Sequence, residues 1–61
     1  MTSDWDKVID SLSTITVTSH PNNEPVTLHG SAPHVTCIGV GTDAAVFQSA
    51  LAPSFALKKY A

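Results

Sequence analysis

Residues 38–47 read IGVGTDAAVF, and residues 55–60 read FALKKY. Apolar residues flank both glycines of the first stretch, which predicts two strands joined by a glycine-containing hairpin, at about 34–40 and 44–51. The second stretch predicts a further strand at about 54–60. These strands decide the fold, because the rest of the chain must pack against the sheet that they form.

The chain begins with a pattern typical of an amphipathic helix. Its apolar residues recur at i, i+3, i+4 and i+7, at Trp5, Val8, Ile9 and Leu12. Ser3 is suited to cap the amino end, and propensity falls near residues 11–13. We expect this helix to cover one face of the sheet through its apolar stripe.

Two more strands are predicted ahead of the glycine hairpin, at residues 15–18 and 26–29. Turn-forming residues separate them at 20–25, and Gly30-Ser31-Ala32-Pro33 makes another break. A last turn is expected at Ala52-Pro53-Ser54. The predicted class is α+β, with a short N-terminal helix and an antiparallel five-stranded β-meander.

Composition excludes several classes of protein. With 43% hydrophobic and 13% charged residues in a chain of 61, the sequence is not typical of disorder. It has a net charge of −2 and no arginine, so nucleic-acid binding is a poor fit. A single cysteine excludes an internal disulfide and a cysteine-based metal site. No apolar run reaches the ~20 residues of a membrane span and no basic, apolar leader is present, so we expect a cytoplasmic protein without membrane contact.

The glycine hairpin and the strand after it contain residues that are suited to bind a nucleotide. Glycines at i and i+2 allow a backbone to approach an anion closely and to present N–H groups to it. Since strand side chains alternate, Ala56 and Lys58 should share a face, on which the small alanine leaves room for a flat base and the lysine reaches towards phosphates. Lys59 should face the other way, into solvent. Two plainer interpretations stay open: a tight hairpin turn for the glycines and an exposed edge-strand residue for Lys58.

The order of these residues carries a family resemblance. Gly39, Gly41, Ala44 and Val46 stand where a G-x-G-x-x-G-x-V loop has its glycines and valine, and Lys58 follows within an Ala-x-Lys triplet. With this motif, residues 35–61 resemble the first three strands of the small lobe of a Hanks-type serine/threonine protein kinase, and especially small bacterial kinase-like proteins. The residues that the resemblance implies for ATP binding are Ile38, Gly39, Gly41, Ala44, Val46, Ala56 and Lys58.

The resemblance also implies a role for each part. Residues 1–61 would be one small domain, with 1–33 as a helix and hairpin extension and 34–61 as the kinase-like strands. The glycines and Ala44 would line the phosphate flap, and Lys58 would hold the α- and β-phosphates. Two departures stand out: alanine replaces the third glycine, and Asp43 places a carboxylate at the hairpin tip.

The catalytic motifs of the family are missing from these residues. A His-Arg-Asp motif requires an arginine, and neither Asp-Phe-Gly nor a Walker A motif occurs. We therefore expect no catalytic residue here; phosphoryl transfer to serine or threonine, with Mg²⁺, is implied only for a parent protein with a catalytic lobe. The expected partners are ATP and either a missing lobe or another protein at the sheet edges. The alternative is a small β-rich protein-interaction module without nucleotide binding.

Histidine and cysteine offer a weaker hypothesis. His29, His34 and Cys37 would make a metal site only if neighbouring strands brought them together, and their spacing, like that of His20, matches no usual ligand motif. We expect no metal, histidines at the surface and a buried Cys37 within an apolar strand.

Overall fold

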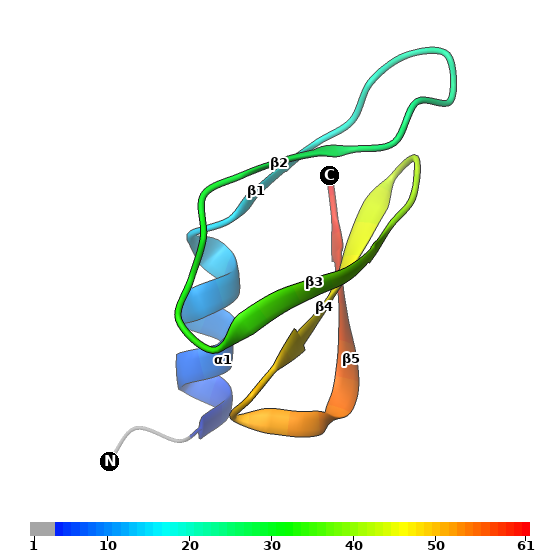
Figure 1. Ribbon diagram of the computed structural model, residues 1–61. Helices are drawn as coiled ribbons and strands as arrows, with labels where there is room; N and C mark the ends of the chain where they lie inside the picture. Colours follow the sequence, from blue (N-terminus) through cyan, green and yellow to red (C-terminus); the bar gives the residue numbers. More distant parts are fainter. Residues whose placement is uncertain (1–3) are drawn as a thin grey trace.

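The computed structural model describes residues 4–61 and contains one helix and five strands (Figure 1). The elements are α1 (Asp4–Ser13), β1 (Thr16–Thr18), β2 (Thr27–His29), β3 (Val35–Val40), β4 (Ala44–Ser49) and β5 (Ala52–Tyr60). All strand pairs are antiparallel, so the α+β class is confirmed. Ser3, the predicted helix cap, lies outside the described residues.

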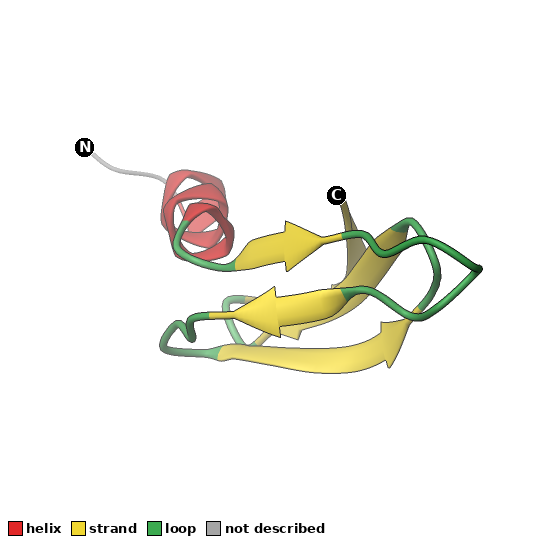
Figure 2. Ribbon diagram, turned by 90° about the horizontal axis from the view of Figure 1, so that it is seen from above, coloured by secondary structure: helices red, strands yellow, loops and turns green. Residues whose placement is uncertain are grey.

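The five strands divide into two sheets. One has the order β1-β2 and the other the order β3-β4-β5, and Figure 2 shows β1 and β2 side by side with opposite directions. The division falls between β2 and β3, where Gly30 has a φ of 95° and His34 a φ of 64°. These left-handed conformations turn the chain out of the first sheet before the second begins. The predicted meander is therefore interrupted once.

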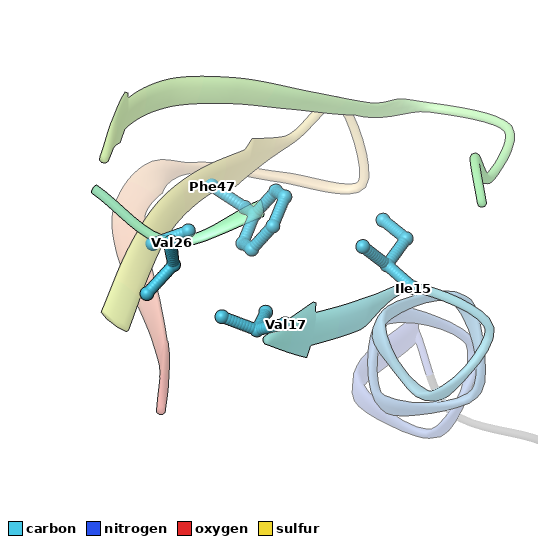
Figure 3. Packing of buried hydrophobic residues seen from close by; sticks show 5 residues of the cluster. Ile15, Val17, Val26 and Phe47 are labelled. Atoms are coloured by element: carbon cyan, nitrogen blue, oxygen red, sulfur yellow. The ribbon is translucent and has the colours of Figure 1, made fainter. Parts of the chain in front are cut away.

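The core lies between the two sheets. Phe47 of β4 is 2% exposed and points from the three-stranded sheet towards Ile15, Val17 and Val26 (Figure 3). Ala45, two residues earlier in β4, faces the same side and is fully buried. Burial of a phenylalanine side chain contributes roughly 1.5–3 kcal/mol, so Phe47 is a principal link between the layers.

Helix α1 packs against β5, although only part of its apolar stripe is covered. Val8 is buried and Leu12 half-buried, whereas Ile9 is 61% exposed. The ring of Trp5 meets the ring of Phe55 edge to face, with 5.1 Å between centroids. The stripe is therefore confirmed as a packing face at Val8 and Leu12, whereas Trp5 stays 44% exposed despite its ring contact and Ile9 is open to solvent. Within residues 4–61, no helix has the length and apolar character needed to cross a bilayer.

The predicted turn at residues 52–54 is wrong. The chain turns at Ala50 and Leu51, and Ala52 already belongs to β5. Ser49 supports this earlier turn, because its hydroxyl oxygen accepts a hydrogen bond from the Leu51 N–H at 3.1 Å. Pro53 fits in β5 because this strand is at the sheet edge, where a missing N–H is tolerated.

Candidate functional site on the outer face of the three-stranded sheet

The register of β4 and β5 decides which predicted residues share a face. Val46 pairs with Lys58, whereas the neighbouring pair, Phe47 and Leu57, faces the core. Ala56 lies two residues before Lys58 in the same strand and therefore shares its face. We call this side of the sheet the outer face. It brings together Val46, Ala56 and Lys58, of which the last two are exposed.

The tip of the glycine hairpin is tied to the rest of the molecule. The Gly41 N–H donates to the Ala44 carbonyl at 2.8 Å, and the Gly41 carbonyl accepts from the Val26 N–H at 2.9 Å. The Asp43 carbonyl accepts from the Ala61 N–H at 2.9 Å. In Figure 1 the tip accordingly lies next to the end of β5. The Gly41 N–H is thus already engaged and would have to leave Ala44 to reach an anion.

The fold itself does not require glycine at either hairpin position. A Cβ atom built on Gly39 would meet nothing within 4 Å, and one on Gly41 would lie at an ordinary contact distance of 3.5 Å from the Ala44 oxygen. Of the described glycines, only Gly30 has a positive φ. Side chains could therefore occupy both positions without disturbing the fold, and the glycines leave open space beside the hairpin.

Two other predicted residues have contrasting positions. Ala44, at the third glycine position, is 3% exposed, so its methyl group is not accessible to a ligand. Ile38 is 54% exposed and lies at the β-bulge between Cys37 and Gly39, where β3 loses its regular register with β4. The bulge interrupts the regular alternation of side chains in β3 at this residue.

Tyr60 is a residue of this face that the sequence prediction missed. The Lys58 Nζ atom lies 5.0 Å from the centroid of the Tyr60 ring, and both residues are exposed. Their i, i+2 spacing in β5 could have indicated the contact. A cation–π contact at an exposed site contributes only about 0.5–1 kcal/mol, so a stronger anionic partner could draw the ammonium group away.

The prediction that Lys59 is solvated is wrong. Lys59 pairs with Ala45 on the core side of the sheet and is half-buried. Its Nζ donates to the carbonyl oxygens of Leu12 at 2.6 Å and Ile15 at 2.5 Å. The last turn of α1 has no basic residue of its own, so Lys59 supplies the positive charge that a helix C-terminus favours.

Cys37 and the histidines do not form a site. Cys37 is exposed, contrary to the prediction, because it lies in the edge strand β3; its Sγ donates to the Gly39 carbonyl at 3.4 Å. His20 is hydrogen-bonded through Nε2 to the Thr27 hydroxyl. No three His, Cys, Asp or Glu side chains within residues 4–61 come close enough together to hold a metal ion.

Two surface hollows are prominent, and neither lies over Val46 and Ala56. One of about 300 Å³ is at the turn between β4 and β5, with Gln48 and Pro53 in its lining. The other, of about 380 Å³, lies between α1 and β5. Its lining residues are Ile9, Leu12, Ser13, Lys58, Lys59 and Tyr60. Of the predicted ATP-binding residues, only Lys58 therefore borders either of these hollows.

Comparisons of this chain with protein-family models, with curated proteins and with solved structures give no significant match. The kinase resemblance therefore stays a hypothesis that rests on the motif residues alone.

Proposed function

We propose that the outer face binds the nucleotide ATP, with the base on Val46 and Ala56 and the phosphates at Lys58. The observation that carries this proposal is the pairing of Val46 with Lys58, which places an apolar surface and a cation next to each other on one open face. Ala56 extends the apolar surface without obstructing a flat base. Ile38, which is exposed in the neighbouring strand β3, would contact the base as well.

The same geometry sets the expected affinity. An exposed lysine–phosphate ion pair contributes about 0–1 kcal/mol, and a base held from one side only gains little burial. The engaged N–H of Gly41 offers no further contact unless its bond to Ala44 opens. We therefore expect millimolar binding, which corresponds to roughly −4 kcal/mol.

The proposal separates binding from catalysis. In a longer kinase-family protein, this face would form one wall of an ATP site, and residues beyond this chain would hold Mg²⁺ and transfer phosphate to serine or threonine. The proposal also places the protein in the cytoplasm, where a free thiol such as that of Cys37 stays reduced.

The test is a titration with the ATP analogue adenylyl imidodiphosphate, followed by amide chemical shifts. We expect shifts at Gly39, Gly41 and Lys58, and a smaller response to adenosine, which has no phosphates. In a Lys58→Gln variant the difference between the two ligands should disappear. Lys7→Gln is the matched control, because it removes the same charge from an exposed residue of α1.

Two results would refute the proposal. One is the absence of shifts on the outer face at millimolar ligand. The other is an equal loss in the Lys58→Gln and Lys7→Gln variants, which would show that the response follows net charge and not position.

A further inference from the structure

The outer edge of β5 presents unpaired backbone groups. The Gly41–Ala44 bond shows that Ala44 directs its backbone groups towards β3, so its neighbour Ala45 directs them towards β5. Lys59, opposite Ala45, therefore bonds to β4, while Lys58 and Tyr60 direct their N–H and C=O groups away from the sheet. Within residues 4–61, no other strand pairs with this edge.

A hollow with an apolar wall lies alongside this edge. It has a volume of about 380 Å³, and Ile9 and Leu12 of α1 form its helical wall. Helix α1 is fixed to β5 at two points, by the Trp5–Phe55 ring contact and by the hydrogen bond from Lys59 to Leu12. Ile9 lies between these points and is 61% exposed. The helix thus stands beside a free strand edge and presents an apolar side chain there.

We propose that an extended peptide with alternating apolar and acidic residues adds to β5 as a fourth strand of the sheet. Its backbone would pair with Lys58 and Tyr60, in the recognition mode in which a peptide extends a sheet. Apolar side chains on one face of the peptide would contact Ile9 and Leu12. Acidic side chains on the other face would be cross-strand neighbours of Lys58. This proposal does not rest on nucleotide binding.

The other edges are less suitable. The bulge between Cys37 and Gly39 interrupts β3, and bulges of this kind protect edges from pairing. Strands β1 and β2 have three residues each, which leaves little backbone for a partner. The regular part of β5 continues from Leu57 to Tyr60.

Charge selects the partner. A second copy of this chain, paired symmetrically through β5, would bring two Lys58 side chains close together on one face, and like charges at such positions are destabilising. An acidic strand instead places a carboxylate beside the ammonium group of Lys58. We therefore assign the edge to an acidic, alternating peptide and not to self-association.

The probe is an acetylated and amidated hexapeptide of alternating valine and glutamate. Strand addition should slow hydrogen exchange of the Lys58 and Tyr60 amides roughly tenfold when about nine-tenths of the protein is bound. The Lys59 amide, which already faces β4, serves as an internal control and should not change. A peptide of the same composition with its valines and glutamates in separate blocks should bind far more weakly. An alternating peptide whose β5-facing amides are N-methylated should also bind far more weakly, because it lacks the N–H groups that would pair with β5.

Charge reversal completes the experiment. Lys58→Glu should weaken binding of the glutamate peptide about tenfold or more and should favour a valine–lysine peptide, whereas Lys7→Glu should change neither affinity. Three results would overturn the proposal. These are unchanged exchange at Lys58 and Tyr60 despite shifts at Ile9, equal binding of the block peptide, and a concentration-dependent dimer that protects the same amides without peptide.

Discussion

The Nζ atom of Lys59 lies 2.6 Å from the carbonyl oxygen of Leu12, and this contact joins the last strand to the end of the helix across 47 residues of sequence. The final carbonyl groups of a helix have no partner within the helix, and a nearby cation is favourable there. Lys59 therefore stabilises both α1 and the position of α1 against β5. Its neighbour Lys58 lies on the opposite face and does not bond to the end of α1.

Replacement of Lys59 by methionine should destabilise the protein. Methionine keeps most of the aliphatic side chain but donates no hydrogen bond, so the carbonyls of Leu12 and Ile15 lose their cation. We expect the free energy of unfolding to fall by about 1–3 kcal/mol in urea titrations. The matched Lys58→Met variant loses only an exposed cation–π contact with Tyr60, so its free energy of unfolding should fall by no more than about 1 kcal/mol. Equal effects of the two substitutions would contradict the assigned role of Lys59.

The glycines should differ sharply in their tolerance of alanine. At Gly30 the φ is 95° and a Cβ atom would lie 2.5 Å from the Thr14 carbonyl oxygen, so Gly30→Ala should cost at least about 2 kcal/mol. At Gly39 a Cβ atom meets open space, so Gly39→Ala should be neutral or stabilise by up to about 1 kcal/mol. Thermal unfolding of the two variants, monitored by circular dichroism, makes the comparison. A large loss of stability at Gly39 would show that this glycine has a structural role.

The two phenylalanine residues of the chain, Phe47 and Phe55, should also differ in how much stability they lose on substitution. Phe47 is 2% exposed between the sheets, and Phe47→Leu should lower the free energy of unfolding by about 1–2 kcal/mol. Phe55 is 54% exposed, so Phe55→Leu loses mainly its ring contact with Trp5, at about 0.5–1 kcal/mol. Urea unfolding midpoints of the two variants, measured under the same conditions, would show which substitution costs more. A larger loss for Phe55→Leu would contradict the assignment of Phe47 to the core.

The sequence was sufficient to predict local structure where a repeating pattern is strong. The helix and all five strands occur within a few residues of their expected positions, because periodicities of 3.6 and 2 are local properties. The shared face of Ala56 and Lys58 follows from the same alternation. The division into two sheets was not predictable in this way, since it depends on left-handed conformations at Gly30 and His34 that the sequence pattern does not distinguish from an ordinary break.

The errors have a common physical origin. Lys59 and Cys37 were assigned from their residue type and neighbours, but their burial depends on which segments lie across from them in space. Lys59 meets the end of a helix from the other end of the chain, whereas Cys37 lies in an edge strand that leaves it exposed. Contacts of this kind form only once the chain has folded, so local sequence patterns do not predict them.

The contact between Trp5 and Phe55 has a consequence for the alignment of β5. Since residues 58 and 59 are both lysine, a slip of β5 by one position would still offer an ammonium group to the end of α1. The same slip would turn Phe55 away from Trp5 and replace it with the small side chain of Ser54. A lysine could therefore bond to α1 in either alignment, whereas the ring contact between Trp5 and Phe55 forms in only one. The contact of Trp5 with Phe55 thus fixes the alignment of β5 relative to α1.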